Sequence, residues 1–268
     1  MYKYMSKRRF SLLAITSFLI ASITISYSAE LQKKILMPVR DYVYFENSAE
    51  LECKNKHGGY GRLYKHGCFI NPVTVAQQVS FITDSVYHGA SLKSEELNQL
   101  RNAFEVLLSH AEKKVVGRKH ALLLPYEFSW PRYGLRPGWV SGMAQGHAIE
   151  IAVALYRETD NSEYLRSAIQ LGNAFRLSTE EGGVTVFTDD GPWFEEYAQA
   201  GKQPSFALNG HIFALEGLSR LKPYTDSFDD IIIQSIQATR SRISLYNATF
   251  WSRYDLRGTP ANQKYHHV

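Results

Sequence analysis

Two adjacent glutamates, Glu195 and Glu196, stand among aromatic residues in the stretch GPWFEEY at positions 191–197. Apolar neighbours disfavour the charged form of a carboxyl group, whereas a phenol can hydrogen-bond it, so such glutamates are candidates for a perturbed pKa. A surface loop with two solvated acids explains the same local composition equally well. Of the pair, we expect Glu196 to be the functional residue and Glu195 to be the more solvated one.

The predicted loops gather carboxylates, phenols and guanidinium groups, and the chain has no phosphate loop, dinucleotide fingerprint or nucleophile elbow. This set suits removal of a proton from a carbon next to a carboxylate. An arginine neutralises that carboxylate, a glutamate or tyrosine takes the proton, and phenols donate to the developing enolate. A second acid on the opposite face returns the proton with inverted stereochemistry. The residues concerned are Glu195, Glu196, Tyr197, Tyr254, Asp255, Arg257, Tyr265, His266 and His267, with Arg132 and Arg136 elsewhere.

Several of these residues also have a purely structural interpretation. Tyr254 and Arg257, three residues apart, could serve only to hold the tail in place. Asn209 fits either a helix N-cap or a ligand. His147 is more readily explained as a buried histidine with its hydrogen bonds satisfied than as a base. The pair His266-His267 is only a weak indication of a metal site.

Hydrophobic periodicity predicts six helices that must position these groups. They cover about residues 72–88, 94–111, 141–156, 162–177, 206–221 and 228–245. Residues 184–188 alternate like a short strand, whereas 115–138 and the tail from 249 look irregular. Antiparallel helical hairpins predict an all-α fold, closed as an α/α toroid with a short β-hairpin. The long loops 130–138 and 183–201 and the tail are expected to wall one mouth, where a carbohydrate could lie.

The start of the chain is typical of a targeting segment. Four basic residues precede an uncharged, largely apolar run over residues 10–27. We expect residues 1–28 to be a signal peptide or, alternatively, a membrane anchor that tethers the protein through residues 10–27. Either way the remainder is expected to be exported: periplasmic, secreted, or anchored with its domain outside the cytoplasm. Residues 29–70 are interpreted as an N-terminal arm and residues 71–268 as the helical domain.

The charge balance argues against nucleic acid as a partner. The 268 residues include 30 basic and 26 acidic side chains, a formal net charge of +4. The whole excess lies in the basic start, so the exported part is balanced and no overall positive charge remains to attract nucleic acid. An anionic substrate must therefore be held by a local cluster of basic residues.

Two cysteines, Cys53 and Cys68, are close in the sequence. In an exported protein such a pair is typical of a disulfide, which would stabilise the fold by roughly 3 kcal/mol in the chain-entropy model. Two free thiols remain an alternative. A metal site formed with His57 and His66 is a third, although the spacing is not that of a common zinc finger.

Five motifs follow one another in the C-terminal half of the chain. They are GWVSGMAQGHA from Gly138, WFEEY from Trp193, SFALNG from Ser205, YDLR from Tyr254 and YH from Tyr265. Together they resemble the C-terminal domain of heparosan-type D-glucuronyl C5-epimerases. The resemblance implies an α/α toroid that converts glucuronyl to iduronyl residues within a polysaccharide, without an organic cofactor. Because the family continues into another helix, we expect this toroid either to be incomplete at its C-terminus or to close differently.

The resemblance also assigns roles to residues. Glu196 and Tyr265 match the acid/base pair of the family, and Tyr254 is a further catalytic candidate lining the site. Tyr197 would line the site too, and Arg257 would hold the substrate carboxylate. The remaining candidates for substrate binding are Glu195, Asn209 and Arg132. The motifs assign no metal ligands, and they leave open which residue serves which face of C5.

Two other functions are compatible with the same residues. A polysaccharide lyase shares the proton abstraction but then expels the 4-linked sugar by β-elimination, which leaves an unsaturated uronate that absorbs ultraviolet light. A non-catalytic exported protein would keep the groove and only bind glycans. The expected partner is in every case a uronate-containing polysaccharide, and we favour the cofactor-independent isomerase.

Overall fold

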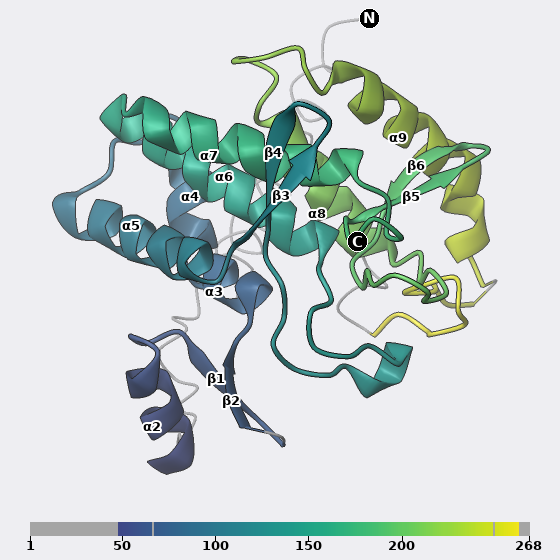
Figure 1. Cartoon of the computed structure of the whole chain (residues 1–268), viewed down its shortest axis with the longest axis horizontal. Coiled ribbons are helices and arrows are strands. Elements are labelled where there is room, and N and C mark those ends of the chain that lie inside the picture. The colour runs from purple at the N-terminus through teal and green to yellow at the C-terminus, as the bar shows by residue number, and fades with distance from the viewer. Residues whose placement is uncertain (1–47, 66, 249, 263–268) are drawn as a thin grey trace, which may run out of the picture. The chain divides into compact units, whose positions relative to one another are not determined.

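Eight α-helices and three β-hairpins make up the part of the chain that the structure, a computed structural model, describes: residues 48–65, 67–248 and 250–262 (Figure 1). The helices are α2 (Ser48–Lys56), α3 (Pro72–Gln78), α4 (Ser80–Tyr87), α5 (Ser94–Ser109), α6 (Gly142–Thr159), α7 (Ser162–Asn173), α8 (Leu208–Ser219) and α9 (Asp229–Arg242). The antiparallel hairpins are β1–β2 (Gly61–Tyr64, Gly67–Ile70), β3–β4 (Glu112–Val116, Lys119–Leu123) and β5–β6 (Thr185–Thr188, Gly191–Phe194). The fold is therefore mostly helical, as predicted, but the described residues contain three β-hairpins where an all-α fold with one short hairpin was expected.

Helix α6 lies at the centre of the described helices (Figure 1). Its residues from Gly142 to Leu155 are all buried, and α3, α4, α5, α7 and α8 pack against it. Ser141 caps its first turn by accepting a hydrogen bond from the Ala144 backbone N–H. Helix α8 approaches so closely that a Cβ on Gly217 would lie 2.1 Å from the Gly146 carbonyl oxygen. A helix that is covered on every side can hold a site at its end rigidly.

Two details differ from the sequence prediction. The single helix expected over residues 72–88 is interrupted at Val79, whose φ of −115° and ψ of 7° end α3 and begin α4. The segment 115–138, expected to be irregular, contains most of hairpin β3–β4, whose strands join through Gly117-Arg118 with Gly117 at φ +59°. Glycine favours the left-handed conformation that such a tight turn requires.

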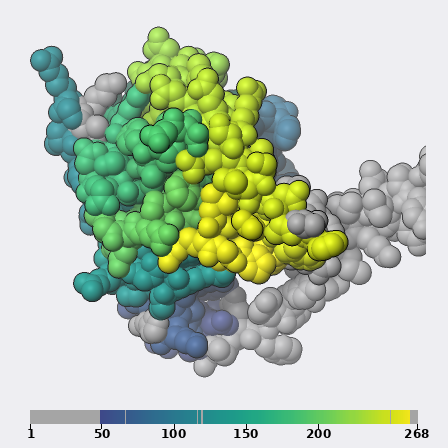
Figure 2. Space-filling model, turned by 90° about the vertical axis from the view of Figure 1, so that its right-hand side faces the viewer, coloured from purple at the N-terminus to yellow at the C-terminus, as the bar shows by residue number. Residues whose placement is uncertain are grey.

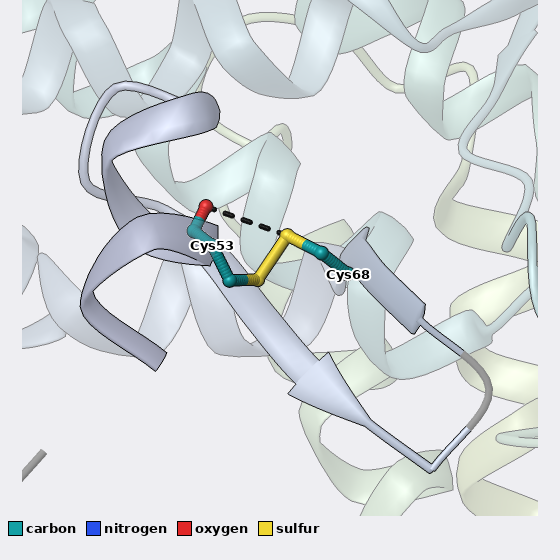
Figure 3. The surroundings of a disulfide bond; sticks show 2 residues. All are labelled: Cys53 and Cys68. Carbon is teal, nitrogen blue, oxygen red and sulfur yellow. Dashed lines mark hydrogen bonds between the residues drawn. A yellow bond between two sulfur atoms is a disulfide. The ribbon is translucent and has the colours of Figure 1, made fainter. Parts of the chain in front are cut away.

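The disulfide prediction is confirmed: Cys53 of α2 is bonded to Cys68 of β2 (Figure 3). This joins the first helix of the described chain to the first hairpin. Tyr64 of that hairpin stacks on Phe128, with 4.5 Å between the ring centroids, and Ile70 is part of the main hydrophobic core. The described residues contain no group of three or more metal-ligating side chains that could hold an ion.

Some predictions concern parts of the chain outside the described residues. These are the signal peptide or anchor over 1–28, the arm as far as residue 47, and Tyr265, His266 and His267. Within the described residues, none of the helices combines the length and the apolar character needed to span a bilayer.

The hairpin β5–β6 leads the chain into the glutamate pair. Its register pairs Thr185 with Phe194 and Val186 with Trp193, in agreement with the short strand predicted at 184–188. Both Trp193 and Phe194 are fully buried, and α9 packs along β6. The strand therefore ends inside the protein, and the residues that follow it are delivered into the interior.

Candidate active site

Glu196 is the second residue after β6 and lines a pocket of about 170 Å³. Only 8% of the residue is exposed. The pocket is lined by Asn71, Val73, Tyr126, Phe128, Trp130, Trp139, Ser141, Glu196 and Tyr197. Its wall is thus mostly aromatic with one carboxyl group, a lining typical of a site that stacks on a ring-shaped ligand and carries out chemistry at one point.

Helix α8 closes the site behind Glu196. A Cβ placed on Gly210 would lie 2.4 Å from the Glu196 Cβ, so only glycine fits at this position of the SFALNG motif. The start of α6 meets the same stretch, because the Gly142 N–H donates to the Glu195 carbonyl oxygen at 2.7 Å. Three of the motifs recognised in the sequence, GWVSGMAQGHA, WFEEY and SFALNG, therefore meet at one place, where two helix starts hold the glutamate pair.

Two phenols form a hydrogen-bonded chain to the Glu196 carboxyl group. The Tyr254 hydroxyl donates to Glu196 Oε2 at 2.8 Å, and the Tyr197 and Tyr254 hydroxyl oxygens lie 3.0 Å apart. Burial raises the pKa of Glu196 to about 7, helped by the neighbouring Glu195 charge and opposed by hydrogen bonds from Tyr254, Tyr197 and Asn209. A carboxyl group with a pKa near neutrality can both accept and release a proton at physiological pH.

The chain after α9 brings Tyr254 to this position. This segment, yellow in Figure 2, lies against the green surface that includes residues near 200. The Tyr254 carbonyl accepts from the Leu208 N–H, and the Leu256 N–H donates to the Ser205 carbonyl. These backbone bonds attach the YDLR motif to the loop before α8, which is how the tail becomes part of the site.

Tyr133 joins the two candidate arginines to the phenol chain, and the sequence interpretation missed it. Its ring stacks on Tyr197 with 4.3 Å between centroids. The Arg132 and Arg257 guanidinium carbons lie 5.9 and 5.5 Å from the centre of the Tyr133 ring, within the range of a cation–π interaction. Both arginines are exposed. Their contacts with the Tyr133 ring bring their guanidinium groups beside Tyr197, where they could bind an anionic group.

Buried Asp255 holds this tyrosine and the YDLR turn together. The Tyr133 hydroxyl donates to Asp255 Oδ2 at 2.6 Å, and the backbone N–H groups of Arg257 and Thr259 donate to Oδ1 at 3.0 and 2.9 Å. The residue is fully buried. The sequence placed Asp255 among the carboxylates of the predicted loops. The three hydrogen bonds that it accepts show that it organises the backbone around Arg257.

The expectation that Glu195 is the more solvated glutamate is wrong. Only 1% of Glu195 is exposed. Its Oε2 accepts from the Ser205 N–H at 2.9 Å and from the Ser205 hydroxyl at 2.7 Å, and its Oε1 accepts from the Phe206 N–H at 2.8 Å. Burial raises the pKa of Glu195, and these three donors oppose the rise. The two adjacent carboxyl groups therefore have different surroundings, one facing a backbone turn and the other the pocket.

Asn209 belongs to the first turn of α8, and the helix is capped at Ala207, so the N-cap interpretation of Asn209 is excluded. Its side chain lowers the pKa of Glu196 by hydrogen bonding. Its Oδ1 is buried and has no hydrogen-bond partner among the described residues. Asn209 therefore lies beside Glu196 with an acceptor free, which fits the alternative in which it contacts a ligand.

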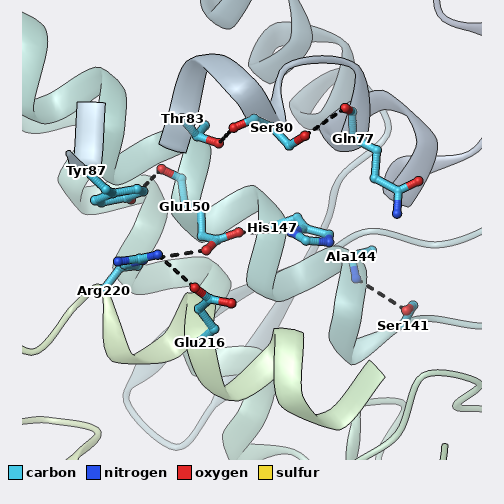
Figure 4. A network of polar contacts seen from close by, with 10 residues as sticks. All are labelled: Gln77, Ser80, Thr83, Tyr87, Ser141, Ala144, His147, Glu150, Glu216 and Arg220. Atoms are coloured by element: carbon cyan, nitrogen blue, oxygen red, sulfur yellow. Dashed lines mark hydrogen bonds and ion pairs between the residues drawn. The ribbon is translucent and has the colours of Figure 1, made fainter. Parts of the chain in front are cut away.

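A second buried polar cluster lies on α6 and its neighbours, apart from the pocket lining (Figure 4). His147 Nδ1 is 2.9 Å from Glu150 Oε2, and Arg220 contacts both Glu150 and Glu216. The Tyr87 hydroxyl donates to the Glu150 carbonyl. These contacts tie α4, α6 and α8 to one another. His147 is buried as expected, but the expectation that its hydrogen bonds are satisfied is wrong for one ring nitrogen: Nδ1 is bonded to Glu150, whereas Nε2 has no hydrogen-bond partner among the described residues.

The fold and the pocket define a class of protein: a helical scaffold that presents a carboxyl group of raised pKa, hydrogen-bonded to a phenol, in a mostly aromatic pocket, which suits acid/base chemistry on a ring-shaped ligand. Comparison with known proteins agrees with this class. Residues 119–268 match the family model described as D-glucuronyl C5-epimerase C-terminus. The chain belongs to this family.

Two similar proteins show how far the relationship extends. An uncharacterized protein of Methanocaldococcus jannaschii is 28% identical over 174 residues, which are 61% of this chain and 56% of that protein. The D-glucuronyl C5-epimerase of Caenorhabditis elegans is 28% identical over 215 residues, which are 75% of this chain and 32% of the worm protein. The matched parts thus span about half of the first relative and about a third of the second.

Proposed function

We propose that this protein is an isomerase that inverts C5 of D-glucuronyl residues within a polysaccharide, giving L-iduronyl residues. One observation carries the proposal: a buried carboxyl group with a pKa of about 7, Glu196, lines the pocket and accepts a hydrogen bond from Tyr254. Membership of the epimerase family and the name of the C. elegans relative support the choice of reaction.

In the proposed reaction no atoms are gained or lost apart from exchange of one proton. Ionised Glu196 removes the proton from C5, and the electrons of the C–H bond pass into the uronate carboxylate to form an enolate. Arg257 and Arg132 neutralise the charge of the substrate carboxylate. Once Glu196 is protonated, the Tyr254 hydroxyl can donate its single hydrogen bond to the enolate instead, and Tyr197 stays hydrogen-bonded to Tyr254. Tyr265 then delivers its hydroxyl proton to the opposite face of C5, the electrons return to carbon, and the configuration is inverted. Solvent takes the proton from Glu196 and returns one to Tyr265, which restores both groups for the next cycle.

The pocket size fits the proposed substrate. At about 170 Å³ it is smaller than the roughly 300–1,000 Å³ of pockets that enclose a complete drug-sized ligand. It would therefore receive one uronyl ring of a longer chain. The aromatic residues Tyr126 and Trp139, which stack on each other with their centroids 3.7 Å apart, line the pocket together with Glu196 and offer it an aromatic surface suited to the face of a sugar ring.

We also propose that the helix pairs follow an α/α toroid, with the site at its mouth, and that the domain works outside the cytoplasm. The packing of α6 against α7 and α8 is compatible with layers of paired helices. The Cys53–Cys68 disulfide supports an oxidising compartment, because structural disulfides are rare in the cytosol. Fractionation of cells that express the full chain, with a cytoplasmic marker as control, tests the location; recovery with that marker would refute it.

Exchange of the C5 proton with solvent tests the proposed reaction. The protein is incubated in heavy water with heparosan and with other uronate polymers, and deuterium at C5 is measured by NMR while absorbance is followed in the ultraviolet. An epimerase incorporates deuterium without new absorbance. New absorbance from an unsaturated uronate would assign a lyase instead, and no exchange in any polymer would leave a glycan-binding protein and overturn the proposal.

A further inference from the structure

Glu195 is an almost fully buried carboxylate next to Glu196, and the proposed reaction gives it no part. All three of its hydrogen-bond partners are donors: the Ser205 N–H, the Ser205 hydroxyl and the Phe206 N–H. The two backbone N–H groups cannot accept a hydrogen bond. A protonated carboxyl group would turn a hydroxyl hydrogen towards groups that donate, whereas a carboxylate accepts a hydrogen bond from every one of them. The contacts therefore favour the ionised form.

The turn that Glu195 holds is unusual. Phe206 has a φ of +52°, and apart from Asp160 it is the only non-glycine residue in the described chain with a positive φ. Such a conformation persists where the surrounding contacts impose it. Here the Phe206 carbonyl accepts from the Tyr246 hydroxyl, and the Ser205 hydroxyl accepts from the Ala207 N–H. The Glu195 carboxylate supplies the acceptors for the other side of this turn.

The same turn sets the position of the groups behind Glu196. It runs directly into α8, which begins at Leu208, so Asn209 and Gly210 follow it within the first helical turn. Gly210 contacts the Glu196 side chain, and Asn209 hydrogen-bonds its carboxyl group. A shift of the turn would therefore move Asn209 and Gly210, the two residues of α8 that lie against the Glu196 side chain.

We propose that Glu195 is a positioning residue: its buried carboxylate holds the Ser205–Phe206 turn in place and keeps a negative charge beside Glu196. The hydrogen bonds fix the geometry of Asn209 and Gly210. The charge adds to the larger effect of burial, and both disfavour ionisation of Glu196. Only the kinetic part of this inference depends on the proposed function.

Several other titratable groups face the two glutamates, and their protonation states determine how a change at Glu195 affects the pKa of Glu196. Tyr126, Tyr197 and Tyr254 lie near Glu196, while Tyr246 and Asp255 lie near Glu195. The pKa of each tyrosine is raised, mainly by burial, so all four stay neutral around pH 7. Asp255 keeps its three hydrogen-bond donors in both the wild type and Glu195→Gln. A change at Glu195 therefore reaches Glu196 as a change of one charge.

Carboxyl-carbon NMR of the full chain labelled with ¹³C at glutamate tests the inference without reference to activity. In the wild-type protein we expect the Glu195 signal to be that of a carboxylate at pH 7, while Glu196 titrates near that pH. In Glu195→Gln the pKa of Glu196 should fall towards its ordinary value, because the neighbouring charge is gone. A protonated Glu195 at pH 7, or an unchanged Glu196 titration in the variant, would overturn the proposal.

Glu150→Gln is the matched control. Glu150 is also buried, at 9% exposure, but it lies eight residues along α6 from Gly142, about 12 Å at 1.5 Å per residue. Neutralising Glu150 should leave the Glu196 pKa unchanged. If the Glu196 pKa falls as much in Glu150→Gln as in Glu195→Gln, the loss of any buried charge has this effect, and the proposal is contradicted. If Glu195→Gln does not fold, the wild-type titration alone still decides whether Glu195 is ionised.

The kinetic test separates positioning from substrate binding. Where exchange at C5 is observed, Glu195→Gln should lower kcat by roughly tenfold to a hundredfold, the loss expected from small displacement of a catalytic group, with little change in KM. The acid limb of the pH profile should move to lower pH, following the Glu196 pKa. A rise in KM with unchanged kcat would instead assign Glu195 to substrate binding. If no polymer is exchanged, the NMR result stands and only the proposed function fails.

Discussion

Replacing Glu196 with glutamine should make the folded protein more stable at neutral and alkaline pH while removing its activity. Burial raises the Glu196 pKa from its ordinary value of 4.5 to about 7. The folded state therefore holds this proton more tightly than the unfolded chain does, and ionising the carboxyl group costs folding free energy. Glutamine keeps the shape and an acceptor for Tyr254 without that cost.

The magnitude follows from the difference of about 2.5 in pKa, at 1.36 kcal/mol for each pKa unit. Between pH 4.5 and 7 the folded protein binds a proton that the unfolded chain has released, so wild-type stability falls as the pH rises through this window. The full loss is about 3 kcal/mol above pH 7. Below pH 4.5 both states are protonated and the contribution disappears.

Urea denaturation of wild type and Glu196→Gln at intervals from pH 4 to pH 8 measures this effect. The free energy of unfolding of the variant should exceed that of the wild type by about zero at pH 4 and by about 3 kcal/mol at pH 8. Groups such as His211, whose pKa burial lowers to about 3, contribute to both proteins and cancel in the difference. A difference that does not depend on pH, or one that grows towards acid pH, would refute the raised Glu196 pKa.

Three further changes test separate parts of the account. Tyr254→Phe removes a hydrogen bond to a charged group, worth about 1.5–3 kcal/mol, so the Glu196 pKa and the acid limb of exchange should rise by about 1–2 pH units; an unchanged pH profile would contradict this. Gly210→Ala places a Cβ against Glu196, and urea denaturation should show about 1–3 kcal/mol of destabilisation, with slower exchange; neutral behaviour would show that α8 can move. Reduction of Cys53–Cys68 should lower the free energy of unfolding by about 3 kcal/mol, measured with and without reductant, and equal stability would show that the loop is not a significant constraint.

Most helices were predictable because each has a clear apolar period and capping signals. The predicted helix at 162–177 is α7 followed by a short 3-10 turn, and the one at 228–245 is α9 with a similar ending. Hairpin β3–β4 was missed because its position depends on tertiary contacts. Leu122 and Leu123 are buried against the rest of the core, and Asn173 of α7 hydrogen-bonds the His120 carbonyl.

The candidate site was partly visible from motif order, since WFEEY, SFALNG and YDLR do meet around Glu196. The arrangement within it was not. Glu195 and Glu196 have the same side chain and nearly the same local sequence, so only the tertiary position of the Ser205–Phe206 turn separates their surroundings. Tyr133 could not be selected among 17 tyrosines because its contacts with Tyr197 and Asp255 span distant parts of the chain.

The central claim is that Glu196 moves the C5 proton of a glucuronyl residue. The most direct test compares wild type and Glu196→Gln in heavy water with heparosan, measuring deuterium at C5 and the appearance of iduronyl signals by NMR. The account predicts exchange and iduronyl formation by the wild type and neither by the variant, with both proteins folded by circular dichroism. Exchange at the wild-type rate in Glu196→Gln would contradict it.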